Sequence, residues 1–144
     1  MYHYIESGLT NIYLKNGVKT EHFDGEEYTS INDIDSLHKI IGHTIVMRKI
    51  PLSGQSFRFL RTELNVSQNI LGNRFGVSEQ TIARYEKGQT QIPRTTDIAL
   101  RTLYTESLEK NHPISFFIDL LSDAEAQNAA DKIIFQQQQG WQLL

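Results

Sequence analysis

The sequence contains no cysteine among its 144 residues, only three prolines, and no long hydrophobic run. The absence of cysteine excludes disulfide scaffolds, thiolate zinc sites, iron–sulfur clusters and cysteine nucleophiles, and it fits a reducing compartment. No stretch approaches the roughly 20 apolar residues that a transmembrane helix needs. The N-terminus lacks the basic-then-apolar order of a signal peptide, so we expect a cytoplasmic protein.

The charge is unevenly distributed along the chain. The total of 14 basic and 17 acidic residues gives a net charge of −3, which taken whole argues against nucleic-acid binding. Residues 1–43 carry a net charge of −4, residues 44–110 of +4 and residues 111–144 of −3. Random scatter is the simplest explanation, but a basic segment between acidic flanks favours separate partners for separate segments.

Hydrophobic periodicity predicts an α+β fold with its strands near the N-terminus. Alternating apolar and polar residues predict strands at Tyr2–Glu6, Ile12–Lys15 and Glu27–Ile31, which we expect to form a small antiparallel sheet. Asn16-Gly17 is the strongest hairpin signal because both residues tolerate positive φ, and Asp24-Gly25 repeats it.

Helical periodicity begins after these strands. One helix is predicted to start after Asn32 or Asp33 and to be ended or weakened by Gly42. Pro51 and Ser53-Gly54 indicate a junction before further helices. The chain then divides into three segments, namely an N-terminal α+β segment over 1–50, a central helical bundle over 51–110, and a C-terminal helix and hairpin over 111–144.

The central segment contains two short helices separated by a tight turn. Ser67 is predicted to cap the first helix, whose inward side chains are Ile70, Leu71 and Phe75. The turn Gly76-Val77-Ser78 ends this helix and caps the next one, and this spacing is typical of a helix-turn-helix motif.

The second of these helices carries polar side chains at its N-terminal end, where a recognition helix meets base edges. Glu79, Gln80, Thr81 and Arg84 lie opposite the apolar positions of the helix, so we predict that they contact bases. Gln pairs with adenine, Arg with guanine, and Glu accepts from cytosine N4. A solvent-facing arginine is the alternative for Arg84, and an acid placed by the helix dipole is the alternative for Glu79.

With these residues the sequence resembles the Xre-type helix-turn-helix family over residues 55–105. The resemblance rests on Ser67-Gln68, on Gly76-Val77-Ser78, and on Arg84-Tyr-Glu-Lys-Gly88 followed by Pro93. It implies base contacts by Glu79, Gln80 and Arg84, phosphate contacts by Gln68, Gln91 and Arg94, and a structural ion pair between Arg61 and Glu86.

A narrower resemblance is to the MqsA-type antitoxins, which place a small sheet ahead of such a motif and share the string Arg84-Tyr-Glu-Lys-Gly88. Zinc-bearing members of that group hold the metal with paired CxxC motifs. Because this chain has no cysteine, zinc is not implied, and we predict no metal and no other cofactor.

The C-terminal helix carries more apolar residues than one buried face requires. Phe116, Phe117, Leu120 and Leu121 are explained either as ordinary core or as a dimer seam. A dimer is attractive because one recognition helix reads few base pairs, and pairing across two half-sites doubles the readout. We therefore predict a homodimer on a palindromic operator.

These observations predict a sequence-specific double-stranded DNA-binding transcriptional regulator, a homodimeric repressor that reads the major groove. The alternative is an antitoxin whose acidic ends bind a basic toxin protein while its middle represses the operon. A third reading is a structural dimer adaptor that no longer reads DNA. Nucleophile-elbow and phosphate-loop patterns are absent, so we predict no catalysis.

Overall fold

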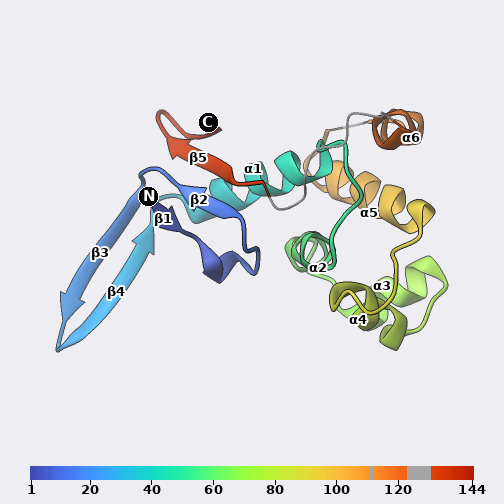
Figure 1. Ribbon diagram of the computed structural model, residues 1–144, viewed down its shortest axis with the longest axis horizontal. Coiled ribbons are helices and arrows are strands. Elements are labelled where there is room, and N and C mark those ends of the chain that lie inside the picture. The colour runs from blue at the N-terminus through green and yellow to red at the C-terminus, as the bar shows by residue number, and fades with distance from the viewer. Residues whose placement is uncertain (111, 123–130) are drawn as a thin grey trace. The chain divides into compact units, whose positions relative to one another are not determined.

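The computed structural model describes residues 1–110, 112–122 and 131–144, which fold as an α+β protein as predicted (Figure 1). The chain divides into two compact units. The first comprises Met1–Ile41 and the C-terminal strands, and the second begins at Gly42 and contains helices α2 to α6. Helix α1 (Ile34–Val46) begins in the first unit and ends in the second.

A four-stranded sheet joins the two ends of the chain within the first unit. Its order is β1-β2-β5-β6, with antiparallel outer pairs and parallel pairing of β2 with β5. Tyr4 hydrogen-bonds to His38 of α1 at 2.7 Å. The strands are β1 (Tyr2–His3), β2 (Ile12–Leu14), β5 (Ile133–Gln137) and β6 (Trp141–Leu143), and a short 3₁₀ helix covers Ile5–Ser7.

The predicted C-terminal hairpin is confirmed by the antiparallel pairing of β5 with β6. Trp141 is 7% exposed, and its indole Nε1 donates to the carbonyl of Asn32 at 2.7 Å. The parallel pairing of β5 with β2 was not predicted. It places the last strands of the chain beside one of the first, a long-range pairing that local sequence patterns do not reveal.

The hairpin expected at Asn16-Gly17 is wrong, because β2 and the next strand do not pair. Both sides of β2 are already occupied by β1 and β5. Asn16 instead exchanges side-chain hydrogen bonds with the backbone of Gln137, and a Cβ at Gly17 would meet the Trp141 ring at 2.6 Å. Asn16 and Gly17 therefore allow the C-terminal hairpin to pack closely against this segment, and they do not form a turn between two paired strands.

The second hairpin signal is confirmed. Asp24 (φ 52°) and Gly25 (φ 78°) connect β3 (Val18–Phe23) to β4 (Glu26–Ile31) in a two-residue turn, and both have the positive φ that a type I′ turn requires. These two strands form a sheet of their own. Figure 1 shows them extending as a ribbon beyond the four-stranded sheet of the same unit.

The second unit is helical. Its helices after α1 are α2 (Gly54–Glu63), α3 (Gln68–Phe75), α4 (Glu79–Glu86), α5 (Arg94–Ser107) and α6 (Ile114–Ser122). Gly42 does not end α1, which continues to Val46. A side chain at Gly42 would collide with the Tyr104 ring, so the glycine allows α1 to lie close to α5. Among the described residues, no helix is long and apolar enough to cross a membrane.

A buried ion pair on α5 holds the segment between α1 and α2. Arg101 and Asp97 lie one helical turn apart and are 0% and 2% exposed. The Arg101 guanidinium donates to the backbone carbonyls of Val46, Arg48 and Ile50, and Asp97 accepts from the backbone N–H of Leu52 at 2.8 Å. Because buried charges are costly unless paired and hydrogen-bonded, this network fixes residues 46–52 against α5.

Candidate nucleic-acid interface

The turn between α3 and α4 is built from capping residues. The Ser67 hydroxyl accepts from the backbone N–H of Ile70 at 3.1 Å and starts α3, which ends at Gly76 in the left-handed conformation (φ 71°). The Ser78 hydroxyl accepts from the N–H of Thr81 at 3.1 Å and starts α4. These caps set the direction of both helices, as the sequence predicts.

Glycine allows the helices of the motif to approach closely. A Cβ at Gly72 in α3 would lie 2.7 Å from the carbonyl oxygen of Val77 in the turn. A Cβ at Gly54 in α2 would lie 2.5 Å from the carbonyl oxygen of Tyr85 in α4. Any larger residue at these positions forces backbone apart, so both glycines fix the position of α4 within the unit.

A partly buried ion pair links three helices. Arg61 of α2 donates through Nε to Glu86 Oε2 at 2.6 Å and through a second nitrogen to Oε1 at 3.0 Å, a two-pronged contact with the end of α4. Gln68 at the start of α3 also donates to Glu86 Oε1, at 3.1 Å. Arg61 further donates to the carbonyl of Val66 at 3.0 Å. The side chain of Glu86 is 4% exposed, so its ion pair with Arg61 fixes the orientation of α4 from the buried side of that helix.

The apolar side of α4 is buried. Ile82 is 0% exposed and Tyr85 is 4% exposed. The ring of Tyr85 meets that of Phe57 edge-on, with centroids 5.8 Å apart. The opposite side of α4 is therefore turned to solvent.

The residues predicted to contact bases lie on that solvent side, within the first turns of α4. Glu79, Gln80 and Arg84 are exposed. Thr81 is half-buried, and its hydroxyl hydrogen-bonds to the hydroxyl of Ser78 at 2.8 Å, so it also serves the helix start. The four predicted residues thus lie on one short helix, and packing of its buried side holds that helix in place.

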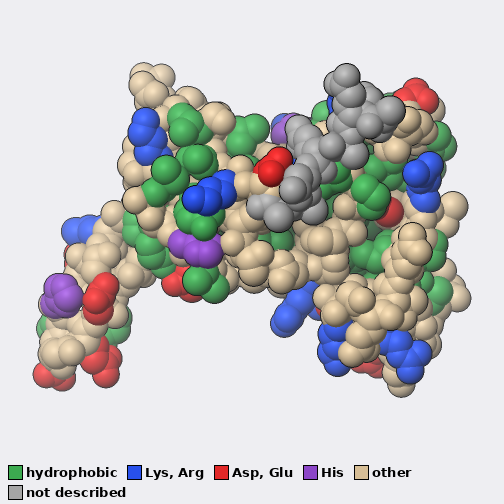
Figure 2. All heavy atoms as spheres, in the orientation of Figure 1, with side chains coloured by type: hydrophobic (Ala, Val, Ile, Leu, Met, Phe, Trp, Pro, Cys, Tyr) green, Lys and Arg blue, Asp and Glu red, His purple; other side chains and the backbone are tan. Residues whose placement is uncertain are grey.

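The residues predicted to contact phosphates flank this helix. Gln91 and Arg94 are exposed in the loop after α4 and at the first position of α5. Gln68 is half-buried, with its amide engaged by Glu86. In Figure 2, Lys and Arg side chains gather over the part of the molecule formed by α2 to α4.

The expectation that Ile70 faces inward is wrong, since it is 46% exposed. Helix α3 has only eight residues, and its buried face is formed by the adjacent Leu71 and Gly72. One residue is about 100° of rotation on a helix, so burial of these two turns Ile70 outward.

The apolar residues of α6 are divided between core and surface. Phe117 is 0% exposed, and α6 packs on α5. Phe116, Leu120 and Leu121 are half-buried, whereas Ile114 and Ile118 are 55% and 46% exposed. The exposed apolar surface of this helix is thus centred on the two isoleucines rather than on Phe117.

Sequence reasoning missed the network of Arg101 and Asp97. The available signal was their spacing of four residues on one helix, which predicts a pair. The same spacing is common on solvated helix faces, so burial and the bonds to residues 46–52 could not be read from it. Among the described residues no group of three or more His, Asp or Glu side chains could hold a metal ion.

Comparison with known proteins agrees with this geometry. Residues 57–100 match the family model described as Helix-turn-helix, which covers most of α2, all of α3 and α4, and the first half of α5. No curated protein and no solved structure matches the chain. Residues 57–100 are therefore similar to a helix-turn-helix domain, and this similarity supports DNA binding and transcription regulation by this part of the chain.

Proposed function

We propose that the protein is a homodimeric repressor that reads the major groove of a palindromic operator with α4. The observation that carries this proposal is the exposure of Glu79, Gln80 and Arg84 on a helix whose other side is fixed. Side chains that read bases must be held in register, because a contact that is free to move discriminates little between bases. The Ser78 cap and the Glu86 ion pair supply that rigidity.

Each exposed side chain suits a different base contact. Arg84 can donate two hydrogen bonds to guanine O6 and N7, and Gln80 can pair with adenine N6 and N7. Glu79 can accept from cytosine N4. Thr81 is half-buried and bonded to Ser78, and in this proposal it contacts a base from the same turn. A good bidentate pair contributes about 1–3 kcal/mol of discrimination against the wrong base.

Phosphate contacts position the protein without reading sequence. In this proposal Gln91, Arg94 and Gln68 bind the backbone on either side of α4. Removing Arg94 then weakens binding to all sequences by a similar factor and lowers the dependence of affinity on salt, because about one fewer counterion is released.

Fluorescence anisotropy with the DNA upstream of the coding region, against scrambled DNA at physiological salt, tests the proposal. We expect Arg84→Ala to lower the preference for the specific DNA by roughly 5- to 150-fold, the equivalent of about 1–3 kcal/mol. Lys110→Ala, which removes one positive charge beyond the end of α5, is the matched control and should leave that preference unchanged. Equal binding of the native protein to both DNAs would refute the proposal.

The dimer would form through α6. Ile114 and Ile118 lie four residues apart on one face of the helix and are exposed, and the half-buried Leu121 extends the apolar surface beside them. The half-buried Phe116 and Leu120 lie on the other side of the helix, so a dimer through the isoleucines would leave them outside its centre. Phe117 supports the helix from the core. Two recognition helices would then meet half-sites about 34–36 Å apart. Sedimentation should give a dimer mass that Ile118→Glu converts to a monomer, and a native monomer at all concentrations would contradict this arrangement.

An antitoxin is the second candidate function. It is favoured by the acidic β3–β4 hairpin outside the helix-turn-helix domain, which is exposed from Lys19 to Ser30, since a DNA-reading domain alone needs no such element. Under this function the protein would bind a basic toxin and repress the operon of the pair. Co-expression with the product of an adjacent small reading frame tests it, and failure of the two proteins to copurify would count against it.

A further inference from the structure

The β3–β4 hairpin is unpartnered within the part of the chain that the structure describes. Every residue from Lys19 to Ser30 is exposed, and among the described strands these two pair only with each other. An isolated two-stranded hairpin is marginally stable at best in water, because it has no core to bury. The hairpin nevertheless has six paired positions and a turn whose φ angles suit it. The two strands of the hairpin are thus regularly paired with each other, but the hairpin buries no hydrophobic core between its strands and other described residues.

One face of the hairpin carries two exposed aromatic side chains. The register pairs Phe23 with Glu26 and Tyr28 with Glu21, and alternation along the strands puts all four on the same face. Phe23 is 73% exposed and Tyr28 is 49% exposed. The Tyr28 hydroxyl donates to Glu26 at 2.9 Å, which holds its ring beside that carboxylate. Aromatic side chains exposed together are typical of the central contacts in protein interfaces.

The negative charge of the hairpin favours some binding partners for this face over others. Val18–Ile31 contains one lysine and four acidic residues, a net charge of −3, and Lys19 is already paired with Glu21 at 2.8 Å. In Figure 2 acidic side chains gather toward the end of the ribbon formed by β3 and β4. Nucleic acid is repelled by such a surface, and so is a second copy of the same hairpin. A protein surface of positive charge is complementary to it.

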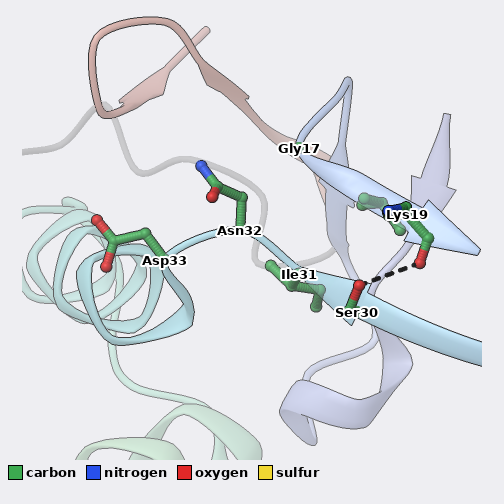
Figure 3. Close-up of a pocket in the computed structure, with 7 residues that line it drawn as sticks. Gly17, Lys19, Ser30, Ile31, Asn32 and Asp33 are labelled. Atoms are coloured by element: carbon green, nitrogen blue, oxygen red, sulfur yellow. Dashed lines mark hydrogen bonds between the residues drawn. The ribbon is translucent and has the colours of Figure 1, made fainter.

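The base of the hairpin adds a hollow that an extended segment could enter. This hollow has a volume of about 510 Å³ and is lined by Gly17, Val18, Lys19, Ser30, Ile31, Asn32 and Asp33. Figure 3 shows these residues on both strands and on the chain leading to α1, with Ser30 bonded to the backbone of Lys19. The surface therefore runs from a polar hollow at the base to an aromatic pair near the tip.

We propose that the β3–β4 hairpin is the docking element for a basic partner protein, which packs an apolar side chain against Phe23 and Tyr28 and places cationic side chains beside Glu21 and Glu26. A partner strand can add to either edge of the hairpin, since the described residues leave this sheet two-stranded. The hairpin lies outside the helix-turn-helix domain, so docking at it does not depend on DNA binding. It rests on the same hairpin as the antitoxin candidate and specifies the contacts that such a partner would make.

Selection of displayed random peptides on the immobilised full chain tests the proposal with a defined probe. We expect the enriched peptides to carry net positive charge and at least one aromatic or large aliphatic residue. Their binding should fall by roughly tenfold or more for Phe23→Ser/Tyr28→Ser, as for the central residues of an interface. It should also fall at about 1 M salt, where the screening length is about 3 Å. Enriched peptides without charge bias, or no enrichment at all, would overturn the proposal.

Matched variants keep the test specific to the hairpin. Glu21→Gln/Glu26→Gln removes two charges while keeping an acceptor oxygen at each position, and we expect roughly tenfold weaker peptide binding, a typical loss for charged contacts at an interface. Glu106→Gln/Glu109→Gln removes the same charge from exposed positions near the end of α5 and should leave binding unchanged, as should Ile5→Ser for the aromatic variant. Equal effects of the hairpin and control variants would overturn the proposal.

Two further measurements, the sedimentation mass and the affinity for DNA, distinguish binding of a partner protein from binding of a second copy of this chain. If the hairpin instead docked on the basic domain of another copy, Glu21→Gln/Glu26→Gln would change the sedimentation mass of the full chain or raise its affinity for DNA. Either result would overturn the partner-protein proposal. We expect both quantities to stay at the native values, whether or not the native protein binds DNA with sequence preference.

Discussion

In helices α2 to α4 the charged residue that sets the geometry, Glu86, is buried and paired, whereas in the β3–β4 hairpin every side chain from Lys19 to Ser30 is exposed. The two regions also differ in support. The apolar side of α4, formed by Ile82 and Tyr85, is buried, whereas no described residue covers either face of the hairpin. The comparison shows that charge has two roles in this chain. In the helical region a buried charge pair fixes the helix that presents polar side chains, and in the hairpin exposed acidic residues make the surface negative.

The largest effect is expected at the buried network that anchors the helical unit. Asp97→Ala leaves Arg101 buried without its carboxylate and leaves the Leu52 N–H without its acceptor. The free energy of unfolding should fall by about 3–5 kcal/mol, measured by urea denaturation. Asp97→Leu/Arg101→Met, which removes both charges, should cost less than the sum of the two single changes. A loss below about 1 kcal/mol for Asp97→Ala would show that the pair does not support the unit.

The second largest loss of stability is expected on the buried side of α4, and it can be compared with a change on the exposed side of the same helix. Glu86→Gln weakens the contact with Arg61 and removes a charge that Gln68 also binds, so we expect a loss of about 2–3 kcal/mol in unfolding free energy. Glu79→Gln makes the same chemical change on the exposed side of the same helix and should cost less than about 1 kcal/mol. Equal losses in denaturant titrations would contradict the division of α4 into a structural and a reading side.

The capping residues and their spacing made the helix-turn-helix predictable from sequence. Ser67, Gly76 and Ser78 act through local hydrogen bonds and φ angles, so each leaves a signal within a few residues. The resemblance to a known family located the positions that could meet DNA, and the structure adds that three of these residues are exposed together on α4.

The features that sequence reasoning missed depend on distant parts of the chain. Asn16-Gly17 has the composition of a hairpin turn, but its role is decided by Gln137 and Trp141, more than a hundred residues later. The contact between Arg101 and the carbonyls of residues 46–50 is likewise non-local. Ile70 fits an inward periodic pattern, yet the short α3 buries only the neighbouring Leu71 and Gly72. Tertiary packing decided all three cases.

A third, smaller effect is expected at the close approach between α3 and the turn. Gly72→Ala places a methyl group 2.7 Å from the Val77 carbonyl, so the turn must shift. We expect a loss of about 1–3 kcal/mol in thermal or chemical unfolding, accompanied by weaker binding to specific DNA. Asn73→Ala, at an exposed position of the same helix, is the control and should stay within about 0.5 kcal/mol of the native protein.

The smallest effect on stability is expected in the hairpin. Phe23→Ser removes a large aromatic side chain, but this side chain is 73% exposed and no described element covers it. The unfolding free energy of the full chain should change by less than about 0.5 kcal/mol. A loss approaching that of Glu86→Gln would show that Phe23 packs against the chain, and the contrast between the two regions would then be wrong.

Selection of bound sequences from random double-stranded DNA tests the central claim, that exposed residues of α4 read the major groove, most directly. If α4 reads the major groove as proposed, the native protein should enrich one palindromic sequence whose half-sites lie about one helical turn apart. Arg84→Ala should lose the preference at one position of each half-site, the guanine that Arg84 contacts, while the rest of the sequence is retained. No enriched sequence for the native protein, or an identical sequence for Arg84→Ala, would show that α4 does not read bases through Arg84.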